Sequence, residues 1–192
     1  MSEPRETYYQ LVLIWIRDAA MFGEYLSQLP PIVAKYGGAA DRIFQPLGVS
    51  GDALTLPHAV NFVHYDDKES YRHFGEDPEF RQIEPLRSGS IDMLAFEGWL
   101  TRANPTSDGF DDRIYAIDLE FSDKTSQPSH EDTGRGVEVE YVLRVDTGSA
   151  VSGRTPHQVR IAYSAGTNGD ATPETSTGST IRITAKPQTL AP

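Results

Sequence analysis

The run from Tyr8 to Ile16 constrains the fold of this chain more than any other segment. Its residues, Tyr-Tyr-Gln-Leu-Val-Leu-Ile-Trp-Ile, are aromatic or aliphatic except for one glutamine. Aromatic and β-branched residues favour strands, and a run with so little polar interruption is typical of a strand that is buried on both faces. The chain is therefore expected to contain a sheet that has its central strand here and that is covered on both sides.

A helix is predicted directly after this strand. Asp18 is a suitable N-cap, and apolar residues then recur at helical spacing. Pro30-Pro31 is expected to break or kink the helix, and Gly37-Gly38 to end it.

Three more strands and a second helical region complete a first domain. The strands are predicted over residues 41–47, 58–65 and 91–97, and the helical region begins at Asp66-Asp67 and opens again at Pro78. The order β-α-β-β-α-β indicates an α+β fold of ferredoxin-like type with helices on one face of the sheet. The other face also carries apolar residues, and a second subunit is its simplest cover, which gives a dimeric α+β barrel.

The pattern of the sequence changes after Gly98, from alternating strands and helices to strands alone. A polar linker is predicted over residues 99–112, between a first domain over residues 7–98 and an antiparallel β module over residues 113–187. The module has four expected strands, near residues 113–121, 137–145, 158–163 and 181–184. Four strands are few for independent stability, so the module is expected to pack on the first domain or on a partner's copy. No internal repeat is visible in the sequence.

Short motifs spread over residues 7–98 carry a resemblance to a known family. They are Tyr9, Pro31-Ile32, Tyr36-Gly37-Gly38, Tyr65, Pro78-Glu79-Phe80, Pro85-Leu86-Arg87 and Glu97-Gly98. In these the first domain resembles a bacterial family of unknown function, often called the DUF thirteen-thirty family, of the dimeric α+β barrel superfamily. His64 departs from the pattern, because the family commonly has an acidic residue there. The superfamily includes cofactor-independent monooxygenases, haem-handling enzymes, isomerases and cyclases, so the resemblance implies a small-molecule cavity and leaves the reaction open.

Charge and composition limit the classes of partner, the location and the cofactors that are expected. The net charge is -11 and both halves are acidic, so nucleic acid and anionic membrane surfaces are not expected partners. The chain has no cysteine, and its N-terminus is acidic and polar without the basic start of a signal peptide, so a cytoplasmic location is expected. His73 and Asp77 have helical spacing but no evident third ligand, and segment 166–170 is a glycine-rich loop without a following helix. No metal and no cofactor are therefore expected.

Two residues are candidates for chemistry. His64 shares a strand face with Val60 and Phe62 and lies at the strand end, where it could act as a general acid or base, or could simply be solvent-facing or hydrogen-bonded. Arg87 could hold a carboxylate or enolate by paired hydrogen bonds, or could be an ion-pair partner of a nearby acidic residue.

Four residues are candidates for substrate contact. Tyr9 and Trp15 share a face of the first strand and could line an apolar pocket, or belong to the core or an interface. Asn61 and Asp92 are polar residues inside apolar strands, and such groups mark a cavity when they are buried.

Two functions follow from these residues. The first is a cofactor-independent isomerase, cyclase or related proton-transfer enzyme that acts on an apolar oxygenated metabolite. In it His64 moves the proton and Arg87 or Asn61 stabilises the enolate. The second is a ligand-binding or protein-assembly module without chemistry. The enzyme is favoured because closed barrels of this type commonly enclose small-molecule cavities, and a homodimer is expected in either case.

Overall fold

The structure is a computed structural model, and it describes residues 6–50, 53–103, 113–121, 137–164 and 180–188. These residues form three helices and eight strands, in the order β1 (Tyr8–Ile16), α1 (Ala19–Ala34), β2 (Ala39–Val49), β3 (Ala59–Tyr65), α2 (Lys68–Glu76), α3 (Pro78–Ser90), β4 (Ile91–Ala103), β5 (Tyr115–Glu120), β6 (Val137–Gly148), β7 (Gln158–Ser164) and β8 (Thr180–Pro187). Each predicted strand is present. β4 continues through Ala103, past the expected start of the linker.

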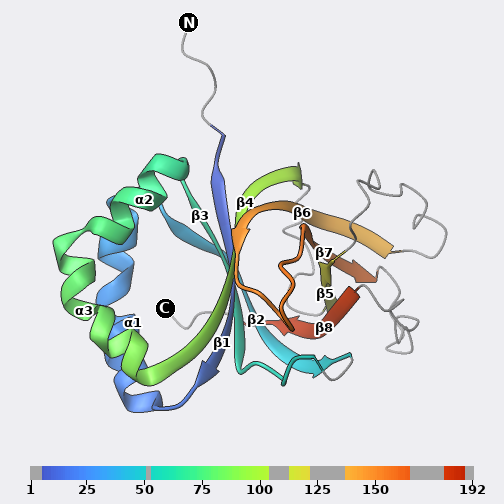
Figure 1. Cartoon of the computed structure of the whole chain (residues 1–192), viewed down its shortest axis with the longest axis horizontal. Coiled ribbons are helices and arrows are strands. Elements are labelled where there is room, and N and C mark those ends of the chain that lie inside the picture. The colour runs from blue at the N-terminus through green and yellow to red at the C-terminus, as the bar shows by residue number, and fades with distance from the viewer. Residues whose placement is uncertain (1–5, 51–52, 104–112, 122–136, 165–179, 189–192) are drawn as a thin grey trace, which may run out of the picture.

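The eight strands close into one antiparallel barrel. The order around it is β1-β3-β2-β8-β5-β7-β6-β4, so the first half contributes β4-β1-β3-β2 and the second half β8-β5-β7-β6. The halves join along two seams, where β2 pairs with β8 and β4 pairs with β6. In Figure 1 the helices lie on one side of β1, β3 and β4, and β5–β8 lie on the other side.

This closure corrects the expectation that a second subunit covers the open face of the first-half sheet. The chain's own strands β5–β8 cover that face, and side chains of both halves fill the barrel in one core that includes Leu11, Phe62, Ile117 and Ile161. A closed barrel has no free strand edge, so a partner chain is not needed to complete the sheet. A homodimer stays a prediction, and it would have to use a different surface.

A second core lies between the sheet and the helices. Alternate residues of β1, such as Val12 and Ile14, face the helices, where Phe22, Ile32 and Ile83 pack on them. β1 is thus buried on both faces, as its unbroken apolar run predicts. None of the described helices is long and apolar enough to cross a membrane.

The helix ends follow the local sequence. The carboxylate of Asp18 accepts a hydrogen bond from the backbone N–H of Met21 at 3.0 Å, which caps α1. Gly37 follows α1 at φ 64°, a left-handed conformation that glycine adopts without a steric penalty. Of the expected break or kink at Pro30-Pro31, the break does not occur, because α1 runs through both residues to Ala34. The burial of Ile32 and Val33 after the prolines holds this last turn against the sheet.

The two halves repeat one topology. In each half the first strand lies between the third and the fourth, and the second strand pairs with the third. The repeat is invisible in the sequence because the outer faces differ in chemistry. In the second half, Asp118 faces outward and is bound by Arg160 at 2.9 Å and by Arg182 at 2.5 Å. A charged outer face offers no apolar surface for helix packing, and the described residues of this half contain no helix.

Candidate functional site

The candidate site is a pocket between the helices and the outer face of the first-half sheet. Its walls are largely apolar, and five polar side chains interrupt them. The full lining is Gln10, Val12, Ile14, Phe22, Tyr25, Leu26, Leu29, Val33, Asn61, Val63, Tyr65, Phe74, Arg87, Ile91 and Met93. The cavity is partly open to solvent and has a volume of about 90 Å³, so it accommodates a small ligand or one part of a larger ligand. A concave, mainly apolar form with a few convergent polar groups is usual for small-molecule sites.

Asn61 is the polar group on the sheet side of this pocket. It lies in the middle of β3, opposite Val12 of β1 and Ile43 of β2. Strand alternation turns its side chain toward the helices, between those of Ala59 and Val63 on the same face. Among the described residues no hydrogen-bond partner occupies its amide. The amide is therefore available to a bound molecule, both as a donor and as an acceptor.

Arg87 and Tyr25 form the polar group on the helix side. Burial raises the pKa of Tyr25 to about 12, and the nearby Arg87 guanidinium, which shares a hydrogen bond with it, opposes this shift. Arg87 also donates a hydrogen bond to Glu84 at 3.0 Å, and its guanidinium lies 5.2 Å from the centre of the Phe80 ring. The ion pair expected as the alternative role of Arg87 is thus present. It joins neighbouring turns of α3, and Arg87 still lines the pocket.

Gln10 lines the pocket at the β1 side. Its amide nitrogen donates to the Tyr71 hydroxyl at 2.9 Å and to Glu97 at 3.1 Å, and the Tyr71 hydroxyl donates to Glu97 at 2.5 Å. Because both amide protons are used, the carbonyl oxygen of Gln10 remains as an acceptor. Gln10 and Tyr25 are pocket residues that the sequence patterns did not single out. The signal for Gln10 was its position as the one polar residue of β1.

His64 and Tyr9 lie on the opposite face of the sheet. His64 alternates with Asn61 along β3 and faces the barrel interior, where its Nδ1 lies 2.7 Å from Asp41. Tyr9 stacks on Phe62 in the same interior, with the ring centres 5.0 Å apart. The structure therefore brings Asn61 and Arg87 together in one pocket and separates His64 from them.

Trp15 and Asp92 also lie outside the pocket. Trp15 packs against the barrel core, and its indole N–H is buried without a hydrogen-bond partner among the described residues. The side chain of Asp92 is 66% exposed and lies 3.6 Å from Arg17. Asp92 is thus a surface ion-pair residue, not a cavity residue.

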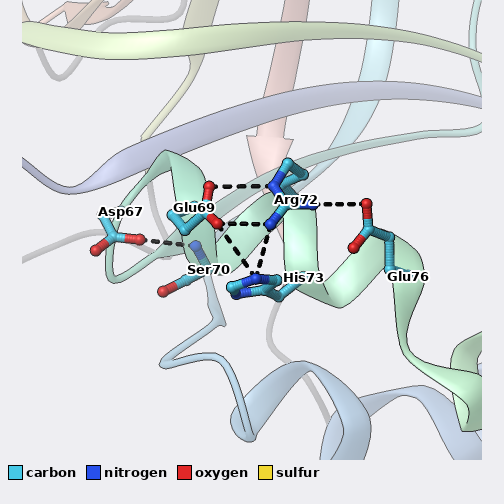
Figure 2. A network of polar contacts seen from close by, with 6 residues as sticks. All are labelled: Asp67, Glu69, Ser70, Arg72, His73 and Glu76. Carbon is cyan, nitrogen blue, oxygen red and sulfur yellow. Dashed lines mark hydrogen bonds and ion pairs between the residues drawn. The ribbon is translucent and has the colours of Figure 1, made fainter.

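The polar residues of α2 form a surface network (Figure 2). Arg72 binds Glu69 at 2.6 Å and Glu76 at 2.7 Å, and His73 lies 3.2 Å from Glu69. Asp77, the residue paired with His73 by spacing, caps α3 instead, since it accepts from the backbone N–H of Glu79 at 2.7 Å. Within the described ranges no three His, Asp or Glu side chains are placed to hold a metal ion. Segment 166–170 lies outside the described residues.

Comparisons with known proteins show the fold of the chain. No protein-family model and no curated protein sequence matches it. Among solved structures, an anthrone oxidase-like protein has a TM-score of 0.61 at 11% identity, over 98% of this chain and 94% of that one. A mutant chlorite dismutase from Candidatus Nitrospira defluvii has a TM-score of 0.51 at 9% identity, over 94% of this chain and 92% of that one. SnoaB, a cofactor-independent oxygenase from Streptomyces nogalater, has a TM-score of 0.38 at 13% identity, over 54% of this chain and 98% of that one.

The similarities to the anthrone oxidase-like protein and to the chlorite dismutase cover both halves of the chain. Their α+β barrel architecture is therefore shared by the whole chain and not only by residues 7–98, to which the sequence resemblance was confined. At such low identities the similarity is one of fold, and the pocket residues have to be interpreted from their own chemistry.

Proposed function

We propose that this protein binds an apolar, oxygen-bearing small molecule in the helix–sheet pocket and stabilises its enolate or phenolate form. The observation that carries the proposal is the unpaired amide of Asn61, set among apolar side chains and sharing one pocket with Arg87. The Asn61 side chain is partly exposed, so the amide is accessible to water and to a bound molecule. A ligand oxygen that displaces this water would take over its hydrogen bond.

The polar groups suit an oxygen that gains negative charge. The amide N–H of Asn61 and the Arg87 guanidinium are hydrogen-bond donors, and donors aimed at a developing oxyanion are the usual means of stabilising it. The carbonyl oxygen of Gln10 is an acceptor, which suits a hydroxyl elsewhere on the same molecule. Enolate stabilisation is the step that isomerisation, cyclisation and oxygenation without a cofactor have in common.

The lining also limits the class of substrate. The described lining residues include no carboxylate and no histidine, and Glu97 is hydrogen-bonded behind Gln10 and Tyr71. A weak carbon acid would need such a base. The pocket alone therefore suits molecules that ionise readily, namely phenols, enols and ketones whose enolate is delocalised over aromatic rings.

Anthrone, a tricyclic ketone of this class, is a suitable probe if its oxygen-bearing edge enters the cavity of about 90 Å³ and its outer rings stay outside, and the anthrone oxidase-like neighbour suggests the same compound. Its enolate can react with O₂ to give anthraquinone and water, a balanced reaction without a cofactor. We expect anthrone to raise the thermal unfolding temperature of the wild type. We also expect anthraquinone to form with uptake of one O₂ per anthrone, faster than in the buffer without protein.

The Asn61→Leu variant tests the role of the amide because it keeps the approximate volume of the side chain. The loss of one hydrogen bond in the pocket predicts an affinity about 3- to 10-fold weaker, from a net contribution of about 1 kcal/mol. Gln28→Leu is the matched control, since Gln28 is an exposed amide on α1 that lies outside the pocket lining.

Three outcomes separate the candidate functions. Binding with turnover that Asn61→Leu weakens supports the enzyme. Binding that Asn61→Leu weakens, without turnover, supports a ligand-binding protein, the alternative that the sequence leaves open. Binding that is equal in Asn61→Leu and Gln28→Leu refutes the pocket as the site.

A further inference from the structure

A second polar cluster lies inside the barrel, on the face of the sheet opposite the helix–sheet pocket. It gathers around the first residues of β1 and β2 and the last residues of β3. His64 and Asp41 are its accessible members, with side chains 28% and 23% exposed. Glu140, deeper in the cluster, is completely buried and binds Arg42 at 2.7 Å.

Two β-bulges bring the carboxylates into this cluster. β2 has a register shift between Ala40 and Arg42, so Asp41 is the extra residue of that strand. β6 has one between Val139 and Tyr141, so Glu140 is the extra residue there. A bulge re-aims a side chain without ending the strand pairing, and bulges are frequent beside active sites.

The two halves repeat this arrangement. In the first half Tyr9 of β1 pairs with His64 of β3, and in the second half Tyr115 of β5 pairs with Tyr163 of β7. The hydroxyl of Tyr9 is hydrogen-bonded to Asp41, and burial together with this carboxylate raises its pKa to about 12.

The second-half tyrosine has the corresponding contact. Burial raises the pKa of Tyr115, and the negative charge of the nearby Glu140 raises it further. Each half therefore aims one tyrosine and one bulge carboxylate at the same region, and Arg42 joins the halves through Glu140. His64 has no histidine counterpart in the second half, because Tyr163 stands in its place.

The geometry around His64 is that of an oriented base. Its Nδ1 lies 2.7 Å from Asp41, and its ring centre lies 6.0 Å from that of Tyr9. Nε2 has no hydrogen-bond partner among the described residues. A carboxylate that holds Nδ1 fixes the tautomer and stabilises the imidazolium that forms when Nε2 takes a proton. The partly exposed ring of Tyr9 is the aromatic neighbour of His64, and it stacks on the buried ring of Phe62.

We propose that this barrel cluster is a second acid–base site, in which Nε2 of His64 takes a proton from a planar aromatic carbon acid or phenol that packs against the exposed part of the Tyr9 ring. The C–H or O–H bond breaks, its electron pair stays on the substrate as an enolate or phenolate, and the proton remains on the imidazolium beside Asp41. The step needs no oxidant, metal or cofactor. It is independent of the helix–sheet pocket, because Asn61 and His64 face opposite sides of the sheet.

A carbon acid that reports proton removal directly is the suitable probe. Loss of the C3 proton of 5-nitrobenzisoxazole breaks its N–O bond and releases a coloured cyanophenolate, with no other reactant. We expect the wild type to accelerate this reaction at neutral pH. His64→Ala should lower the rate about 100-fold, the low end of the usual contribution of a general base, and Asp41→Asn about 10-fold or more.

The controls distinguish a lost base from a lost fold. His73→Ala removes an exposed histidine on α2 and should leave the rate unchanged. His64→Gln keeps a polar side chain of similar size, so a variant that unfolds at the wild-type temperature and has still lost the rate identifies the imidazole as the base. A wild-type rate equal to that of His64→Ala or His64→Gln overturns the proposal, whatever the anthrone experiment shows.

Discussion

Gly98 lies where one chain closes its own barrel, and its replacement tests that closure. It pairs with Tyr9 of β1 on one side and with Val145 of β6 on the other, next to a register shift in the β4–β6 seam. A Cβ at this position would lie 1.9 Å from the backbone oxygen of Arg144. That oxygen belongs to β6 and cannot rotate away, so Gly98→Ala must push the two strands of the seam apart.

The structure allows the cost to be estimated. Forcing an extra methyl group into a packed contact costs about 1–3 kcal/mol, and each ladder hydrogen bond lost at the seam adds about 1 kcal/mol. We therefore expect Gly98→Ala to lower the free energy of unfolding by about 2–4 kcal/mol. For a chain of this length that corresponds to a fall in Tm of roughly 5–15 °C.

A matched control lies at the other seam. Gly48 of β2 pairs with Thr184 of β8, also at a register shift, but a Cβ there would meet no atom within 4 Å. Gly48→Ala should therefore leave stability unchanged or raise it by about 0.5 kcal/mol, because alanine loses less backbone entropy on folding. Urea unfolding followed by circular dichroism measures both variants. Equal stability of Gly98→Ala and Gly48→Ala would refute the closed β4–β6 seam.

Two further predictions concern charge. Asp118→Asn should lower the free energy of unfolding in urea by about 3 kcal/mol, the low end for breaking a buried ion pair, since it leaves Arg160 and Arg182 without their buried carboxylate. A loss below about 1 kcal/mol would show that the network is screened by solvent. The stability of the protein at alkaline pH tests the buried tyrosines, because the pKa values of Tyr9 and Tyr25 are raised from 10.0 to about 12. The native state then holds protons that the unfolded state has released, so stability is complete below pH 10 and should fall between about pH 10 and 12. Absorbance at 295 nm should show these tyrosines ionising later in the native protein than in the urea-unfolded protein, and coincident titrations would contradict the prediction.

The local signals in the sequence predict the elements well. The apolar run of β1, the cap at Asp18 and the left-handed Gly37 each depend on neighbouring residues, and the structure has them all. At Pro30-Pro31 the helix continues without a break, because packing of the following residues against the sheet outweighs the local preference of proline. Local pattern also predicts which residues share a strand face, and so places Asn61 and His64 on opposite faces.

What the sequence could not predict depends on long-range pairing. Nothing in β2 or β8 specifies that the two strands pair, and a free edge looks the same whether a partner chain or the same chain completes it. The extra residue at Asp41 is likewise visible only once the register of β2 against β3 is known. Alternation along β3 cannot tell which face has a cavity, so the sequence left open whether Arg87 shares a pocket with Asn61 or with His64, and the structure places it with Asn61.

A crystal structure of the protein with anthrone bound tests the helix–sheet pocket most directly. We expect the molecule between α1 and the first-half sheet, with its oxygen within hydrogen-bonding distance of the Asn61 amide and the oxygen-bearing ring against Val12 and Val63. The proposed site would be contradicted if anthrone bound only elsewhere. It would also be contradicted if the pocket stayed empty at an anthrone concentration that saturates the thermal shift.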